Sequence, residues 1–129
     1  MMQSVHLMGE GYEPHVTQEE GKLTYSLPVD SGFISYEFAF EISRHDLDIL
    51  LSDDYRRAVL EITAHTLLQR STLKGYDRFI QKDFDKLVTN TLHSTPDFLQ
   101  TFISQISHEH HIVIEHYVKD IMDRRSASQ

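Results

Sequence analysis

The sequence predicts an α+β fold, in which an antiparallel β-hairpin or a three-stranded sheet packs against four or five amphipathic helices. Residues 22–27 and 33–42 each alternate apolar and polar side chains, as half-buried strands do. From residue 43 onward, apolar residues recur every three or four positions, which is helical spacing. The 129 residues, 40% of them hydrophobic, suit one domain with its own core, so we expect a single domain over residues 1–129.

The hairpin is the clearest local signal. Its first run places odd-numbered apolar residues on one face, and its second run places even-numbered ones there. The loop between them, residues 28–32, is rich in turn formers, which favours a hairpin. A slip of one residue would expose the apolar set, so the register should be strict. Residues 1–21 carry no sustained period, and within them residues 5–8 are the candidate third strand.

Two helix starts follow the hairpin directly. Ser43 is a suitable N-cap, with Asp46 in the first turn, for a short helix that ends near residue 51. Ser52 is the expected N-cap of a longer helix over residues 53–70, whose first residues are acidic and therefore complement the helix dipole. The apolar positions of this second helix recur at helical spacing, so it should face the sheet.

Three further segments complete the expected helical layer. Gly75 breaks the pattern, and the next helix is expected over residues 76–92. Thr95, followed by proline and aspartate, is a strong helix-start signal. The last periodic segment, residues 110–125, fits a helix, although residues 111–114 could instead form a strand beside the hairpin. We favour the helix because the pattern is longer than a typical strand.

Composition excludes several function classes. The chain has no cysteine, which rules out thiolate catalysis and cysteine-ligated zinc. No apolar run approaches the roughly 20 residues of a membrane span, and residues 1–11 lack the features of a signal peptide. A Gly-x-Ser-x-Gly elbow and a glycine-rich phosphate loop are also absent. We therefore expect a cytoplasmic protein that is not an enzyme, uses no cofactor and binds neither membrane nor nucleic acid.

The excess of negative over positive charge lies entirely in the first half of the chain. Residues 10–54 hold 11 acidic residues but only Lys22 and Arg44 as cations, whereas residues 55–129 carry a net charge of +1. Acidic segments repel phosphates and attract basic proteins. Ordinary solubility and helix capping are the alternative explanation. The expected partner-binding carboxylates are those of Glu37, Glu41, Asp46, Asp48, Asp53 and Asp54.

A histidine-rich stretch offers a competing hypothesis, that of a metal-binding protein or a metal-dependent enzyme. The zincin motif fails, because Ile112 occupies the position where its second histidine is required. On one continuous helix, however, His108, His111 and Glu115 would share a face and could hold zinc with one open position. A helix end within this stretch would destroy the alignment, and a solvated histidine-rich junction is the simpler interpretation.

Two other side-chain patterns have an ordinary explanation beside a functional one. Glu61 and His65 lie four residues apart on a predicted helix, a spacing that suits a base and its orienting acid, but also a surface pair. Cations also recur every fourth residue and could track an anionic ligand. Gly75 and interleaved aspartates favour a solvated face for these cations. They are Arg70, Lys74, Arg78, Lys82 and Lys86.

Residues 38–57, read as a strand, a short acidic helix and a second capped helix, resemble small bacterial immunity proteins of contact-dependent and polymorphic toxin systems. This resemblance covers a limited part of the chain and rests on no defining motif, so it transfers no site residue. It implies a non-enzymatic protein that neutralises a cognate toxin by binding it. Such toxins are often nucleases, so the expected partner is a basic protein, such as a nuclease toxin domain.

Overall fold

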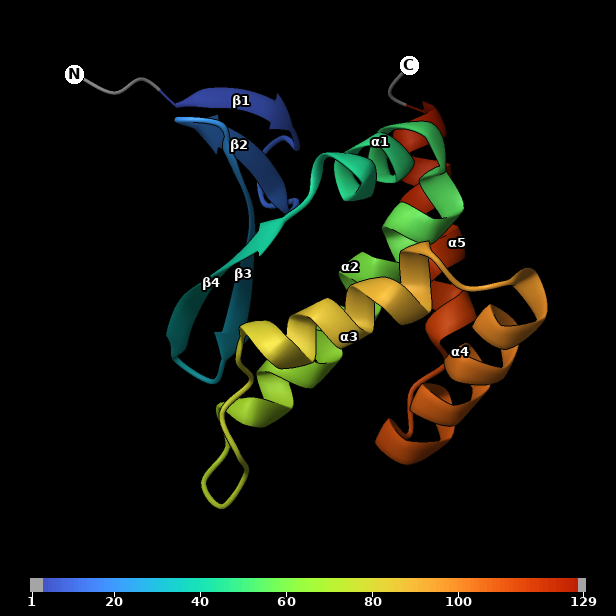
Figure 1. The fold of residues 1–129 in the computed structure, drawn as a ribbon. Helices are drawn as coiled ribbons and strands as arrows, with labels where there is room; N and C mark the ends of the chain where they lie inside the picture. The colour runs from blue at the N-terminus through green and yellow to red at the C-terminus, as the bar shows by residue number, and fades with distance from the viewer. Residues whose placement is uncertain (1–3, 128–129) are drawn as a thin grey trace.

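The structure, a computed structural model, describes residues 4–127 and has an α+β architecture (Figure 1). Within this range it contains four strands followed by five helices. The strands are β1 (Val5–Met8), β2 (His15–Glu19), β3 (Lys22–Ser31) and β4 (Ile34–Ile42). The helices are α1 (Arg44–Ser52), α2 (Asp54–Ser71), α3 (Gln81–Leu92), α4 (Pro96–His110) and α5 (Ile114–Ala127).

The strands form one antiparallel sheet in the order β1-β2-β3-β4, so β1 and β4 are its edges. The sheet therefore has at least one strand more than the two or three that the sequence predicts. β1 lies where the candidate third strand was predicted, but β2 falls in a segment expected to be irregular. In β2 only Val16 is fully buried, opposite Tyr25 of β3. One inward apolar residue leaves too weak an alternation to predict a strand.

The β3–β4 hairpin keeps one register from Leu23–Ile42 to the Ser31–Ile34 pair. Its connection is therefore Gly32 and its successor, a two-residue turn, and not the five-residue loop expected over residues 28–32. Gly32 has φ of 66°, which the first position of a type II′ hairpin turn requires. The alternation of inward and outward side chains was predicted correctly.

Helix capping explains where α1, α2 and α4 begin. Ser43 caps α1 and forms a reciprocal capping box with Asp46, as predicted. Thr95 caps α4, also as predicted. For α2 the expected cap was wrong by one residue: Ser52 ends α1, and the Asp53 side chain accepts from the backbone N–H of Arg56.

Two later boundaries differ more from the sequence prediction. Helix α3 begins at Gln81 and not at residue 76, because residues 72–80 form an irregular connection. The last segment does contain a helix, as we favoured, but only from Ile114. No strand forms over residues 111–114, where His111 adopts a left-handed conformation that ends α4.

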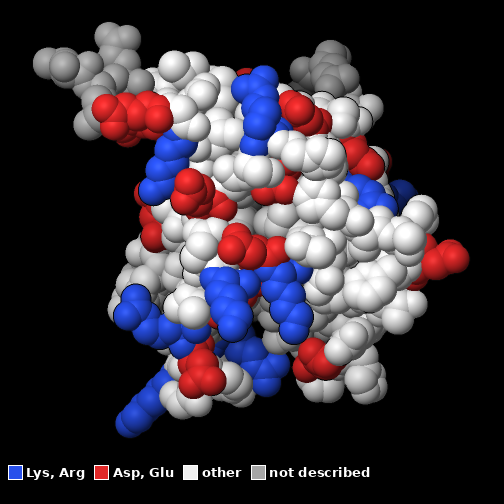
Figure 2. All heavy atoms as spheres, in the orientation of Figure 1, with Lys and Arg blue, Asp and Glu red and all other residues white. Residues whose placement is uncertain are grey.

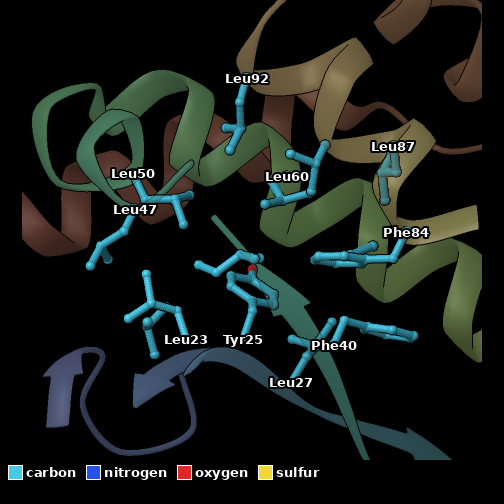
Figure 3. Packing of buried hydrophobic residues seen from close by; sticks show 14 of the residues in the cluster. Leu23, Tyr25, Leu27, Phe40, Leu47, Leu50, Leu60, Phe84, Leu87 and Leu92 are labelled. Atoms are coloured by element: carbon cyan, nitrogen blue, oxygen red, sulfur yellow. The ribbon is translucent and has the colours of Figure 1, made fainter. Parts of the chain in front are cut away.

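The main core lies between the sheet and the nearest helices. Figure 3 shows side chains of β3 and β4 below and those of α1, α2 and α3 above. Tyr25 and Phe84 are fully buried, with ring centroids 5.4 Å apart, and Phe84 stacks on Phe40 at 4.5 Å. Each such aromatic pair contributes about 0.5–1.5 kcal/mol beyond burial of its area. These contacts hold α3 against β4.

A second apolar cluster joins α2 to α4 and α5 on the side away from the sheet. Helix α2 therefore lies in the middle of the molecule and buries residues on both sides, so the single sheet-facing stripe predicted from its sequence is only part of its buried surface. All five helices lie on one side of the sheet, as Figure 1 shows, and the other sheet face is left open. None of the helices within residues 4–127 is both long and apolar enough for a membrane span.

Candidate protein-binding surface

Strand β4 places Glu37 and Glu41 on the open face of the sheet. Their inward neighbours Phe40 and Ile42 are buried against the helices, whereas both glutamates are exposed. Alternation along a strand puts Ala39 on the same outward face, between the two carboxylates. The predicted direction of these two side chains is therefore confirmed.

The carboxylates of α1 lie on the helical side of the molecule. Asp46 is largely buried: its Oδ2 accepts from the backbone N–H of Ser43, and its Oδ1 lies 2.6 Å from Nε2 of His93 at the end of α3. Asp48 is exposed and lies 3.4 Å from Nε of Arg44. Exposed pairs of this kind contribute little, so Asp48 keeps its charge accessible. Asp46, by contrast, has a structural role.

The two aspartates at the start of α2 also differ. Asp53 is the N-cap, and its Oδ2 lies 3.6 Å from Nε of Arg56. Asp54 is exposed in the first turn. The six predicted carboxylates therefore do not form one continuous surface: two lie on the open sheet face, two are exposed on the helices, and two are used in capping.

Cations gather elsewhere. Figure 2 shows Lys and Arg side chains concentrated over α3 and the connection before it, with carboxylates interspersed. Lys82 and Lys86 are exposed on α3, but Arg70 belongs to α2, where its guanidinium covers the ring of Tyr76 at 4.8 Å. The predicted cationic ladder thus spans two helices and a loop, and not one helix face.

The predicted metal ligands do not come together on one helix. His108 lies on α4, His111 is the left-handed residue after it, and Glu115 lies on α5. Glu115 Oε1 instead accepts a 2.6 Å hydrogen bond from the Tyr55 hydroxyl. Across residues 4–127, no group of three or more His, Asp or Glu side chains has a metal-binding arrangement. The helix end at His111 is the physical reason why the alignment fails.

Glu61, considered above with His65, belongs to an ion-pair network. Arg125 donates from Nη2 to Glu61 Oε1 and from Nε to Glu13 Oε2, both at 2.7 Å. Arg57 lies 4.0 Å from the same Glu13 oxygen. These side chains are mostly buried, and they connect the loop between β1 and β2 to α2 and α5. No local pattern in the sequence marks this network, because Glu13 and Arg125 are 112 positions apart.

Two shallow hollows lie on the helical side. The larger, of about 420 Å³, contains Tyr55, whose hydroxyl also accepts from Gln100. Burial, together with the hydrogen bond to Glu115, raises the pKa of Tyr55. The other, of about 360 Å³, contains His110, whose pKa is lowered by burial and by the charge of Arg70. Both sets of contacts connect helices.

A row of aromatic side chains runs along the face of β4 that points toward the helices. The ring centroids of Tyr36 and Phe38 are 6.1 Å apart, and those of Phe38 and Phe40 are 6.5 Å apart. Phe79 then contacts Phe40 edge to face at 5.7 Å. Burial increases along this row, from the exposed Tyr36 to the buried Phe40. The alternation of β4 predicts burial of this whole face, because a sequence pattern does not show how far along the strand the helices extend.

No protein-family model, curated protein or solved structure matches this chain. Functional inference therefore depends on its own residues. Three features of β4 bear on the recognition of a partner: its outward glutamates, its free backbone edge, and the partly exposed aromatic row on its helix-facing side.

Proposed function

We propose that the protein is a non-enzymatic binding module for a basic protein, which it contacts through the outward carboxylates of β4. The observation that carries this proposal is the exposure of Glu37 and Glu41 on the sheet face opposite the helices. The sheet backbone fixes the points from which both side chains emerge, so no backbone has to become ordered when a cation binds them. Asp48 and Asp54 add exposed negative charge on α1 and α2.

Long-range electrostatics supports a basic partner. The net charge of −9 over residues 10–54 creates a field that raises the encounter rate with a cationic surface. Asp46 and Asp53 contribute to this field, but both are engaged in capping contacts, and the Asp46 side chain is only 14% exposed. The contact surface is therefore smaller than the six carboxylates predicted from the sequence.

The resemblance of residues 38–57 to immunity proteins gives this proposal a specific form. A nuclease toxin binds phosphates with cations, and a rigid acidic surface can cover those cations and block the substrate. In this role the protein neutralises a basic toxin domain without performing a reaction. Its partner would be encoded beside it.

The test measures association of the protein with the product of the gene directly upstream, in low salt and in physiological salt. The variant carries Glu37→Lys and Glu41→Lys. The control carries Glu109→Lys and Asp120→Lys, which change the net charge equally on exposed residues of α4 and α5. We expect association of the first variant to slow by about tenfold and that of the control to change far less.

Raising the ionic strength from about 0.01 M to 0.15 M shortens the Debye length from about 30 Å to 8 Å, so association should also slow with salt. Equal rates for the two variants would show that the β4 carboxylates are not the contact. Absence of binding to the upstream product would reject the immunity role.

A further inference from the structure

The backbone edge of β4 is exposed and regular. β4 is the last strand of the sheet, and its pairing with β3 shows no bulge along its length. Natural sheets commonly protect such edges with proline, bulges or covering segments, because an open edge accepts another strand. On the free side of β4, the side chain of Gln81 contacts the backbone of Glu41, and that contact shows which backbone groups point outward.

Gln81 makes two hydrogen bonds with the backbone of Glu41. Its Oε1 accepts from the Glu41 N–H and its Nε2 donates to the Glu41 carbonyl, each at 2.8 Å. The Glu41 backbone groups therefore point away from β3. Because this direction alternates along an antiparallel strand, the groups of Ser35, Glu37 and Ala39 also point to the free edge.

The register of Pro28 supports the same assignment. Pro28 lies opposite Glu37, and proline has no N–H to donate to a neighbouring strand. In a non-hydrogen-bonded pair of an antiparallel ladder, the N–H and carbonyl groups of both residues point away from the partner strand. Proline therefore fits such a pair without loss of a hydrogen bond between the two strands. The N–H and carbonyl of Glu37 are therefore turned to the edge, as the Gln81 contact indicates.

The side chains along this edge present two different surfaces. On the open face of the sheet, Glu37 and Glu41 flank the small Ala39. On the other face, the aromatic row ends with the partly buried Phe38 and the exposed Tyr36. A strand added here would place alternate residues over carboxylates and over aromatic rings, so basic and apolar residues in alternation would complement it.

We propose that β4 binds its partner by strand addition, accepting an antiparallel segment with alternating basic and apolar residues at Ser35, Glu37 and Ala39. The proposal rests on the proposed function, because it specifies how a basic protein is recognised. A second copy of β4 is the less favourable occupant. Antiparallel self-pairing would bring the Glu37 and Glu41 carboxylates of the two copies into opposite or diagonal positions, where like charges repel.

The probe is a synthetic peptide of alternating lysine and valine, seven residues long and blocked at both ends. Binding and the exchange of backbone amides are followed by NMR on the full chain. We expect slower exchange at Ser35, Glu37 and Ala39 when the peptide is bound, because their N–H groups become hydrogen-bonded. Amides on α4 serve as internal controls.

Matched peptides separate backbone pairing from charge. Methylation of the lysine amide nitrogens removes the donors that face β4, whereas methylation of the valine nitrogens leaves them intact. We expect the first peptide to bind about tenfold more weakly or worse and the second to bind almost as the parent does. A glutamate–valine peptide should not bind, because its carboxylates would oppose those of β4.

A protein variant gives an independent measurement. Ala39→Pro removes one outward N–H without taking a donor from the β3 ladder, and edge strands tolerate proline. Peptide affinity should fall by about five- to tenfold. If this variant fails to fold, the methylated peptides still decide the question.

The outcomes distinguish the two proposals. Strand addition would be overturned if peptide binding depended on salt but was equal for the two methylated peptides, and if exchange of the β4 edge amides did not change. That result would still support the acidic surface. Peptide affinity unchanged by Glu37→Lys and Glu41→Lys would overturn both. A dimer of the protein with protected edge amides would overturn the present inference, because a second copy would then be the occupant.

Discussion

The guanidinium of Arg125 donates to the Glu13 carboxylate across 2.7 Å, joining the end of α5 to the loop between β1 and β2. The same guanidinium bonds to Glu61 of α2, so a single side chain connects three parts of the chain. Burial lowers the pKa of Arg125, but the charges and hydrogen bonds of Glu61 and Glu13 raise it by more. The net effect is a pKa above the usual value for arginine. Arg125 is therefore charged at neutral pH.

Replacement of Arg125 should destabilise the fold markedly. Arg125→Gln would remove the Arg125 ion pair from the mostly buried Glu61 and would leave Glu13 with only the more distant Arg57. We therefore expect the free energy of unfolding to fall by about 2–4 kcal/mol. Urea denaturation measures this change. Arg124→Gln is the matched control, since its pair with Asp120 is exposed and should contribute less than about 1 kcal/mol. Equal losses for the two variants would contradict a structural role of the network.

Glu13 should make stability depend on acid pH. Burial, the largest single influence, raises its pKa, but Arg125, the backbone N–H of Glu10 and Arg57 together lower it below the usual 4.5. A carboxyl with a lowered folded pKa stabilises fully above its unfolded value and loses this contribution as pH falls through the folded one. Stability should thus decline below about pH 4.5.

The variant Glu13→Gln tests this dependence. It should be less stable than the native protein at neutral pH and should show a shallower loss of stability in acid. Chemical denaturation at several pH values from about 3 to about 7, a range that brackets the usual carboxyl pKa, gives the comparison. Parallel curves for the two proteins would show that Glu13 does not titrate with a lowered pKa.

Local signals in the sequence were enough to predict much of this fold. Ser43 with Asp46, and Thr95 before proline, mark helix starts because each cap is satisfied within one turn. β2 was missed because its stability comes from pairing with β3, a tertiary property. The start of α3 was misplaced because residues 76–80 continue the apolar spacing without forming a helix.

The candidate site was predicted unevenly for the same reason. Strand alternation was sufficient to predict the outward direction of Glu37 and Glu41. It could not show that His93, a distant residue, would meet Asp46. Nor could it show that α4 would end at His111, since no glycine marks this left-handed position. Contacts between distant segments decide which predicted carboxylates remain accessible.

Two glycines allow backbone strain to be separated from close packing. Gly9 and Gly75 have φ of 99° and 93°, a region that side chains disfavour. A Cβ on Gly9 would lie 2.1 Å from the carbonyl oxygen of Pro14, whereas one on Gly75 would meet nothing within 4 Å. Gly75→Ala should cost about 1–3 kcal/mol, and Gly9→Ala about 1–3 kcal/mol more. Thermal or urea denaturation of both variants gives the difference, and equal costs would contradict the close approach at Gly9.

Gln81 should control where the free edge of β4 ends. In Gln81→Ala the N–H and carbonyl of Glu41 lose both partners, but they lie at an exposed edge where water can replace them. The free energy of unfolding should therefore fall by only about 1 kcal/mol, while exchange of the Glu41 amide should become much faster. Gln105→Ala, which removes an exposed contact to Glu109 on α4, is the control and should leave Glu41 exchange unchanged. A Glu41 amide that exchanges equally fast in native and variant protein would mean that the Gln81 contact does not protect it. The direction assigned to the whole edge would then lose its main support, because the alternation from Glu41 to Ala39, Glu37 and Ser35 starts from that contact.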